Sequence, residues 1–411
     1  MSKIDELIAK LCPNGVEYKM LGELGILYTG LTGKSKDDFS DGNFRFISYK
    51  NVYDNIAVNL AYDNYVKIYD GEKQNNLVFG DILFTGSSET PEDVGMSSVV
   101  TTNMTEQIYL NSFCFGYRLN NKSLYLPDFL KYLFRSSIIR SNIIKCASGV
   151  TRFNVSKKLF LKILIPVPPL EIQREIVKVL DTFTKLEAEL EAELEARRRQ
   201  YHYYRDQLLS FNNEVEYIKL IDVCEYVDYR GKTPKKAEAG IFLVTAKNIR
   251  KGFIDYDVSK EYISHHDYED VMRRGKPKLG DVLITTEAPC GYVAQVDNEN
   301  IALAQRVIKY RSKTPKLNNT FLKYVLLGTE FQNKLDKTAT GATVKGIKGS
   351  KLHQLTIPVP PLEEQARIVT ILDKFDALVN DLSNGLPAEI AARRKQYEHY
   401  RDRLLTFKEA Q

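Results

Sequence analysis

Two glycine-containing segments combine hydroxyl and cationic side chains in a pattern that suits contact with a nucleic acid. They run from Ala147 to Asn154 and from Thr340 to Lys348. Glycine lets the backbone come close to a duplex, hydroxyl groups and lysines bind phosphates, and Arg, Asn or Lys side chains can hydrogen-bond to base edges. The sequence therefore predicts two corresponding DNA contacts, with an ordinary solvated surface as the alternative for any single residue.

The chain around these segments is rich in positive charge. Residues 129–170 contain eight Lys and Arg and no Asp or Glu, and residues 321–362 contain six Lys against two acids. The net charge of the whole chain is only +5, so its distribution, not its total, supports DNA binding. The residues that we expect to contact DNA are Lys50, Asn51, Arg152, Asn154, Lys157, Lys158, Lys232, Thr233, Lys247, Asn248, Lys345, Lys348 and Lys351.

The motifs of common nucleotide and DNA enzymes are incomplete in this sequence. Gly33-Lys-Ser35 and Gly231-Lys-Thr233 resemble the end of a phosphate-binding loop, but Tyr28 and Tyr226 replace the required earlier glycine. No dinucleotide-binding or acyl-transfer motif occurs. The Pro-Pro pairs lack the neighbours that an amino-methyltransferase uses, and Asp128 has no acidic partner for a nuclease metal. We therefore expect no catalytic residue and no bound cofactor.

The cysteine and histidine residues do not have the spacing of a metal site. The five cysteines stand far apart without a Cys-x-x-Cys pair, so we expect reduced thiols, mostly in the core. His265 and His266 have no helical partner or nearby cysteine, so no metal is expected. With 43% hydrophobic residues, no membrane-length apolar stretch and an acidic N-terminus, the chain is expected to fold in water in the cytoplasm.

An internal repeat organises the whole chain. Ile165–Glu171 recurs as Ile357–Glu363, and Ala196–Phe211 recurs in similar form as Ala392–Phe407. Weaker echoes lie upstream: Val16-Glu-Tyr18 with Val215-Glu-Tyr217, Lys50-Asn51 with Lys247-Asn248, Gly80–Leu83 with Gly280–Leu283, and Phe129–Tyr132 with Phe321–Tyr324. The repeat predicts a globular domain and a helix, followed by a second domain and a second helix.

The closely repeated blocks predict two long helices. Between Ile172 and Phe211, apolar or aromatic residues recur about every 3.5 residues, which is the coiled-coil period. The second copy keeps this seam from Ile368 to Phe407, with a predicted break near residues 383–387 and Pro387 in the restarted first turn. A helix of roughly 40 residues is about 60 Å long, so a paired strut is favoured over a core helix of a separate bundle.

The globular regions predict an α+β fold class. They contain short β-branched and aromatic runs such as Phe44–Ser48 and Ile241–Thr245, and their clearest helices are at 129–144 and 321–335. The predicted boundaries are 1–15 for an N-terminal helical segment, 16–164 and 212–356 for the domains, and 165–211 and 357–411 for the long helices. The segment Ile4–Leu11 is expected to pack against the C-terminal helix.

These repeated motifs resemble those of the specificity subunit of Type I restriction-modification enzymes. The doubled Ile-Pro-Val-Pro-Pro-Leu-Glu, Gln173, Gln365, the Tyr-Arg-Asp blocks and Gly385–Ile390 carry the resemblance, which covers essentially the whole chain. It implies two target-recognition domains that read the halves of a split DNA sequence, separated by two antiparallel helices. It also implies docking of two methyltransferase (M) subunits and of restriction (R) subunits, to which S-adenosylmethionine, ATP and Mg would belong.

Several residues of the helices are expected to act in spacing or partner docking. A tetrapeptide beginning Leu-Glu-Ala is written three times and resembles the family's spacer repeat; it either measures the spacing or only extends a good helix. The expected residues are Leu186, Leu190, Leu194, Arg198, Tyr201, Arg205, Arg394, Tyr397 and Arg401. Packing along the helix seam is an equal alternative for the tyrosines.

The two halves differ in sequence, so the predicted DNA target is bipartite and asymmetric. Like domains related by an approximate two-fold axis would place their DNA-reading faces about one helical turn apart. Two other functions stay open from sequence alone. One is a stand-alone DNA methyltransferase or nuclease, and the other is a coiled-coil scaffold that does not bind DNA.

Overall fold

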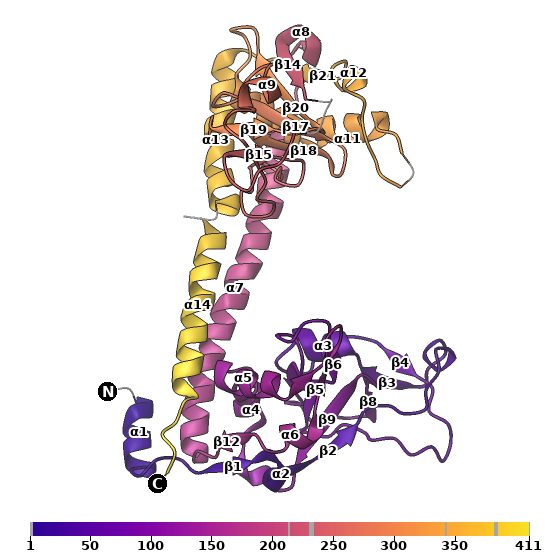
Figure 1. Cartoon of the computed structure of the whole chain (residues 1–411), viewed down its shortest axis with the longest axis vertical. Coiled ribbons are helices and arrows are strands. Elements are labelled where there is room, and N and C mark those ends of the chain that lie inside the picture. The colour runs from indigo at the N-terminus through magenta and orange to yellow at the C-terminus, as the bar shows by residue number, and fades with distance from the viewer. Residues whose placement is uncertain (1–2, 213, 230–233, 342, 382–384, 411) are drawn as a thin grey trace. The chain divides into compact units, whose positions relative to one another are not determined.

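The computed structural model describes residues 3–212, 214–229, 234–341, 343–381 and 385–410. The chain forms two compact units, which we call unit 1 (Met1–Leu190 and Ile390–Gln411) and unit 2 (Glu191–Glu389). Each unit combines a globular domain with parts of the predicted long helices (Figure 1). None of the described helices is both long and apolar enough to cross a membrane.

The predicted long helices are present, but they begin later than expected. The first is α7 (Leu170–Leu208), and the second consists of α13 (Leu362–Asn380) and α14 (Leu386–Leu404). The residues placed at the helix starts instead form strands β12 (Leu164–Pro166) and β21 (Thr356–Pro358). Proline lacks a backbone N–H and keeps the preceding residue extended, so each helix begins only after the Pro-Pro pair.

The second helix is interrupted at the predicted position. Helix α13 ends at Asn380 and α14 begins at Leu386, with Pro387 in its first turn, where the missing N–H of proline costs no helical hydrogen bond. Residues 382–384 of the predicted break lie outside the described residues. Helix α13 belongs to unit 2, whereas α14 belongs to unit 1 from Ile390 onward.

Both units build the same antiparallel sheet. Its strand order is β2-β9-β5-β7 in unit 1 and β14-β20-β17-β18 in unit 2. A smaller sheet accompanies each one, β4-β3-β8 and β16-β15-β19, and in both the middle strand pairs parallel with the last. The paired strands β1-β12 and β13-β21 join each domain to its helix start. The loosely repeated sequence therefore folds twice in one topology.

The two units share the order of the strands in these sheets but differ in their shorter elements, because the sheet β10-β11-β6 has no counterpart among the described strands of unit 2. Unit 1 contains α1 Lys3–Leu11, β1 Tyr18–Met20, α2 Leu21–Leu24, β2 Gly25–Thr29, η1 Asp37–Phe39, β3 Phe44–Ile47, α3 Tyr49–Asp54, β4 Tyr65–Val66, β5 Ile82–Thr85, β6 Ser87–Ser88, β7 Ser97–Val99, β8 Ile108–Leu110, β9 Cys114–Leu119, η2 Lys122–Leu124, α4 Pro127–Leu133, α5 Ser137–Lys145, β10 Ala147–Ser148, β11 Phe153–Val155 and α6 Lys157–Phe160. Unit 2 contains β13 Tyr217–Lys219, α8 Leu220–Val223, β14 Cys224–Asp228, β15 Ile241–Val244, β16 Tyr262–Ile263, α9 Tyr268–Val271, β17 Val282–Thr286, β18 Cys290–Gln295, β19 Ile301–Leu303, β20 Val307–Ser312, α10 Asn319–Leu327, α11 Thr329–Thr338 and α12 Gly349–Leu352.

Each of the two helices predicted within the domains is in fact a pair. Helices α4 and α5 replace the single helix expected at 129–144, and α10 and α11 replace the one at 321–335. Ser136 and Gly328 interrupt them with extended backbone, at ψ of 150° and 146°. Serine and glycine both favour such N-cap positions, so a new helix begins at each.

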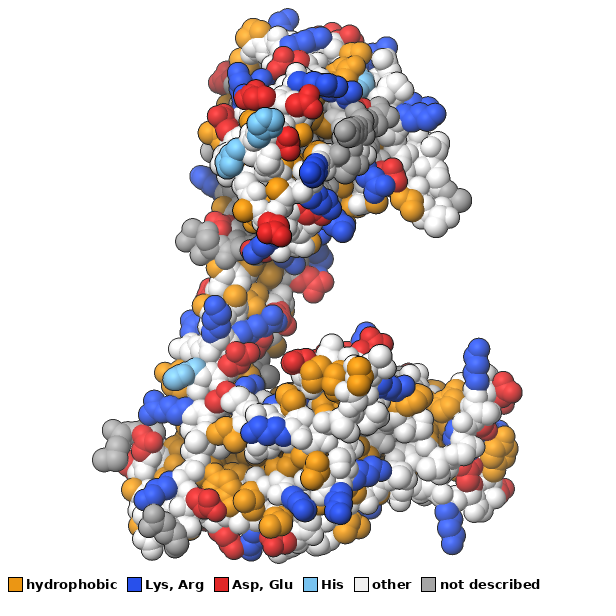
Figure 2. Space-filling model, viewed as in Figure 1, with side chains coloured by type: hydrophobic (Ala, Val, Ile, Leu, Met, Phe, Trp, Pro, Cys, Tyr) orange, Lys and Arg blue, Asp and Glu red, His pale blue; other side chains and the backbone are white. Residues whose placement is uncertain are grey.

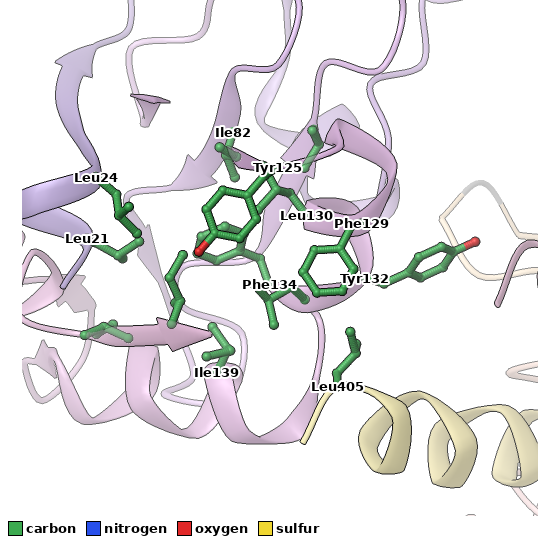
Figure 3. Packing of buried hydrophobic residues seen from close by; sticks show 14 of the residues in the cluster. Leu21, Leu24, Ile82, Tyr125, Phe129, Leu130, Tyr132, Phe134, Ile139 and Leu405 are labelled. Atoms are coloured by element: carbon green, nitrogen blue, oxygen red, sulfur yellow. The ribbon is translucent and has the colours of Figure 1, made fainter. Parts of the chain in front are cut away.

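An apolar core ties the helices of unit 1 to its sheet. Figure 3 shows Phe129, Leu130 and Phe134 of the α4 region grouped with Ile82 of β5. Leu405, from the segment after α14, belongs to the same cluster (Figure 3). The core therefore joins residues from both ends of the chain.

The two ends of the chain are also joined by backbone hydrogen bonds. The amide of Val16 donates to the carbonyl of Lys408 at 2.8 Å, and the amide of Ala410 donates to the carbonyl of Val16 at 2.9 Å. Ile4 of α1 is buried in the cluster that contains Leu405. The N-terminal segment thus packs against the residues that follow the C-terminal helix, close to where the sequence places it.

Candidate nucleic-acid interface

A short hairpin presents the first predicted DNA-binding segment in unit 1. Its strands β10 and β11 form a sheet with β6, in which Asn154 lies opposite Ser87. The turn requires Gly149, whose φ is +145°, because a Cβ atom there would lie 2.0 Å from the carbonyl oxygen of Arg152. Val150 at the tip is 91% exposed. The hairpin therefore extends its turn into solvent.

The described residues of the second predicted segment, which exclude residue 342, form a matching hairpin in unit 2. Gly341 has φ +120°, and a Cβ atom there would lie 2.1 Å from the carbonyl oxygen of Val344. Thr340 and Gly346 exchange backbone hydrogen bonds across the hairpin, each 2.9 Å long. In both units the turn bends at a glycine that faces the carbonyl three residues later.

One arginine of the first hairpin is exposed and yet held in place. The Nε of Arg152 donates to Ser87 Oγ at 3.0 Å, and its guanidinium lies 5.7 Å from the ring centre of Phe113, which is 58% exposed. Lys50 and Arg152 line one open hollow of about 770 Å³. The fold thus brings together two predicted DNA-binding residues that are distant in the sequence.

The same hollow also contains acidic side chains. Asp54, Glu89 and Asp93 line it. Asp93 accepts hydrogen bonds from Thr90 at 2.6 Å and from Tyr53 at 2.7 Å, and these bonds hold the pKa of Asp93 below its usual value. The charge around the hollow is therefore mixed. Figure 2 shows a similar mixture of cationic and acidic side chains on the visible faces of both units.

Most of the other predicted DNA-binding residues lie on the surface. Lys345 forms an ion pair of 3.3 Å with Asp336. Lys232 and Thr233 lie outside the described residues. The exposed residues are Lys50, Arg152, Asn154, Lys157, Lys158, Lys247, Lys345, Lys348 and Lys351. Their exposure leaves them accessible to a polyanion.

Two of the three asparagines predicted to contact DNA, Asn51 and Asn248, are buried and are already hydrogen-bonded within the fold. Asn51 is 3% exposed and exchanges hydrogen bonds with the backbone of Asn59. Asn248 is fully buried; its amide donates to the carbonyls of Asp255 and Ser259, and its oxygen accepts from Thr245. Both side chains use their hydrogen-bonding groups to hold loops, so they cannot read a base edge.

Several of the cations in residues 129–170 of unit 1 also make contacts within the fold. Lys131 forms ion pairs with Asp128 and Asp181, both 2.9 Å long. Arg135 donates to several backbone carbonyls, and burial lowers its pKa to about 10. Arg140 donates to three carbonyls in residues 92–95. A count of charges along the sequence therefore overstated the cations that DNA can reach.

The lysine of the first incomplete phosphate-loop motif is already engaged in an ion pair. Lys34 is paired with Glu72, and its side chain is only 3% exposed. Residues 231–233 of the second motif lie outside the described residues. Within the described ranges, no group of three His, Cys, Asp or Glu residues is placed to hold a metal ion.

Buried glutamines, whose role the sequence did not reveal, anchor the long helices. Gln173 donates to the carbonyls of Leu124 and Pro168, both at 2.8 Å, and accepts from the amide of Leu126 at 2.9 Å. Gln365 makes the same three contacts in unit 2, with Lys316, Pro360 and Asn318. Their repeated position in the sequence was the available signal.

The predicted docking residues of the helices divide into buried and exposed groups. Tyr201 is 4% exposed and Arg205 is 6% exposed, so packing inside unit 2 accounts for both. Tyr397 and Arg401 are partly buried in unit 1. Leu190 and Leu194 are also partly buried, whereas the exposed residues are Leu186, Arg198 and Arg394. The exposed group alone offers substantial surface to a partner.

The repeated Tyr-Arg-Asp blocks attach the helices to the domains. Asp206 accepts from the amide of Thr329 at 3.2 Å and from its hydroxyl at 2.6 Å, at the start of α11. Asp402 accepts from the amide of Ser137 at 3.0 Å, at the start of α5. A carboxylate at these two helix starts satisfies free N–H groups and the helix dipole.

Comparisons with known proteins match this doubled arrangement. The family model described as Type I restriction modification DNA specificity domain matches residues 13–196 and again 212–392. The EcoR124I/EcoR124II type I restriction enzyme specificity subunit of Escherichia coli is 38% identical over 280 residues, which cover 62% of this chain and 64% of that protein, slightly less than two thirds. The MjaVIII type I restriction enzyme specificity subunit of Methanocaldococcus jannaschii is 24% identical over 371 residues, covering 84% and 81%.

A solved structure shows the same fold. It was determined to explain complex assembly and conformational transition of the type I R-M system. One of its chains superimposes with a TM-score of 0.63 at 19% identity, covering 96% of this chain and 98% of that chain. At this identity the similarity concerns the fold alone.

Proposed function

This chain belongs to the Type I restriction modification DNA specificity domain family, and from that premise we propose that it is the specificity subunit of a Type I restriction-modification complex. The observation that carries the proposal is the duplication: the family model matches both halves, and each half builds the same four-stranded sheet, the same smaller sheet and a similar glycine-bent hairpin. Each unit would read one half of a DNA target.

The two halves of the target would differ. The hairpins have the same backbone turn but different side chains, with Arg152 in one and Val344 in the other. Different side chains present different hydrogen-bonding and apolar groups to base edges. The proposed target is therefore bipartite and asymmetric.

The chain would direct chemistry that its partners carry out. The proposed partners are double-stranded DNA, two methyltransferase subunits that methylate adenine, and restriction subunits. S-adenosylmethionine, ATP and Mg would be bound by those subunits. The incomplete catalytic motifs of this sequence support a role without a reaction centre of its own.

Salt-dependent DNA binding tests this proposal. With the methyltransferase subunits present, binding should weaken steeply as salt rises, because phosphate contacts release counterions. Lys157→Glu and Lys158→Glu should each weaken binding, because both lysines are exposed. Lys10→Glu, at an exposed position of α1, serves as the matched control and should leave affinity nearly unchanged.

The rival functions predict different results. Salt-independent behaviour of the complex on DNA, with no effect of Lys157→Glu or Lys158→Glu, would favour the scaffold. Methylation of DNA by the purified chain alone with S-adenosylmethionine would contradict the assignment of catalysis to the partners.

A further inference from the structure

Arg152 and Val344 occupy the same position in the two hairpins. Each follows its positive-φ glycine by three residues. Each hairpin ends in an equivalent hydrogen bond: the amide of Val155 donates to the carbonyl of Gly86 at 3.1 Å, and that of Ile347 to Thr286 at 2.9 Å. These two bonds fix the register. The comparison between the two side chains is therefore a comparison at one backbone site.

The surroundings of this site correspond as well. The amide of Gly86 donates to the carbonyl of Phe113, and that of Thr286 donates to the carbonyl of Arg306, both at 2.8 Å. The position beside the hairpin is thus an exposed aromatic ring in unit 1 and an arginine in unit 2. Arg306 lies 3.7 Å from Glu287, so its charge is partly balanced.

In unit 1 the site presents an ordered guanidinium. Ser87 Oγ accepts a hydrogen bond from the Nε of Arg152, and the guanidinium lies over the ring of Phe113. Among the described residues, no carboxylate forms an ion pair with Arg152. The two terminal nitrogens therefore remain available as a fork of donors, which matches the O6 and N7 acceptors of guanine in the major groove.

In unit 2 the site presents an apolar side chain. Val344 is 51% exposed and, having no polar group, cannot hydrogen-bond to a base edge. The neighbouring Lys345 is paired with Asp336. An exposed aliphatic group at a base edge suits the 5-methyl group of thymine, which is the apolar feature of the major groove.

We propose that this hairpin position is a specificity-determining site in both units, where Arg152 selects guanine in one half of the target and Val344 selects thymine in the other. The inference rests on the proposed function and adds to it a named residue and a named base in each half. Part of the difference between the two half-sites would then come from two different side chains at equivalent backbone positions.

Mapping of methylated sites with the full chain and its methyltransferase subunits tests the proposal. Arg152→Gln should relax the preference for guanine at one position of one half-site by roughly 10- to 100-fold and leave the other half unchanged. Val344→Arg should replace thymine by guanine at one position of the opposite half. Val344→Arg changes an exposed side chain in the other hairpin, so we expect this variant to fold. Its result therefore tests the proposal even if Arg152→Gln fails to fold.

The control separates base reading from general binding. Lys158→Gln, which removes an exposed cation near the first hairpin, should lower methylation of all sites without altering the preferred sequence. A wild-type target without guanine in one half, an unchanged preference in Arg152→Gln, or a loss that is uniform over sequences would overturn the assignment of Arg152. An unchanged preference in Val344→Arg would overturn that of Val344. If the wild-type complex methylates no specific site, the proposed function itself fails.

Discussion

At the scale of single residues, the buried glutamines link the long helices to the globular domains most directly. Gln365 connects the start of α13 to the loop before α10 through Lys316 and Asn318, and Gln173 makes the equivalent connection in unit 1. Both side chains are fully buried. Their partners are backbone groups, so the contact tolerates change in the loop sequence but not loss of the glutamine.

Replacement of Gln365 should destabilise unit 2. Gln365→Ala removes three hydrogen bonds and leaves the amide of Asn318 and two carbonyls without that partner, so we expect the free energy of unfolding to fall by about 2–4 kcal/mol. Gln354→Ala, at an exposed position, should change it by less than about 0.5 kcal/mol. Denaturant unfolding of the two variants measures both values. Equal stability of the two would show that the buried contacts contribute little.

The sequence repeat identified these glutamines but did not predict the contacts that they make. The repeat marked Gln173 and Gln365, but two of the three backbone partners of each side chain lie more than 40 residues away, which no pattern predicts. The same repeat marked Asn51 and Asn248 as DNA contacts, but the structure buries both side chains, and the sequence pattern did not predict that burial. Repetition alone does not separate structural from binding residues.

At the scale of elements, the carboxylates that meet helix starts make the attachment of helix to domain sensitive to pH. Partial burial would raise the pKa of Asp206, but hydrogen bonds from Thr329 and the charge of Arg205 outweigh it and hold the pKa below its usual value. A depressed pKa in the folded state means that the unfolded state binds the proton more tightly. The resulting stability is present above the unfolded pKa, about 3.9, and is lost as pH falls through the folded value.

Asp206→Asn should reproduce this loss at neutral pH. We expect the free energy of unfolding to decrease by about 1 kcal/mol at pH 7, because a hydrogen bond to a charged acceptor becomes one to a neutral acceptor. The difference from the unmodified chain should shrink as pH falls from about 5 toward 3. Asp222→Asn, on an exposed side chain, is the control. A difference that is constant with pH would contradict the role assigned to the charge.

The repeated tetrapeptides of α7 give a prediction about spacing. One further Leu-Glu-Ala-Glu unit inserted before Leu194 lengthens the helix by about 6 Å, since each residue adds 1.5 Å. We expect the gap between the two half-sites to grow by one or two base pairs, at about 3.4 Å each. A map of methylated sites measures the gap. An unchanged gap would show that the repeat only extends a stable helix.

Element boundaries show where sequence patterns stop being informative. The apolar period predicted the long helices and the break before Pro387, because these depend on local spacing. It did not predict that β12 and β21 occupy the expected helix starts, or that Ser136 divides α4 from α5. Those details depend on strand partners such as β1 and β13, which lie far away in the sequence.

At the scale of the whole molecule, the chain repeats one combination of domain and long helix. The end of a long helix is joined to the start of a domain covalently in one copy and by noncovalent contacts in the other. In unit 2, α7 continues covalently through Leu209 and Phe211 toward β13. In unit 1, the segment after α14 meets the N-terminal residues through hydrogen bonds at Val16 and apolar contacts of Leu405. The duplicated units and their differing surfaces support the proposal that one chain reads two unlike half-sites.

The most direct test of that claim is a methylation map of DNA modified by the complete complex, made for the natural chain and for one in which a relative's domain replaces residues 16–160. We expect two unlike half-sites at a fixed separation, of which the replacement changes one and preserves the other. A palindromic target, or a replacement that alters both halves or neither, would contradict it.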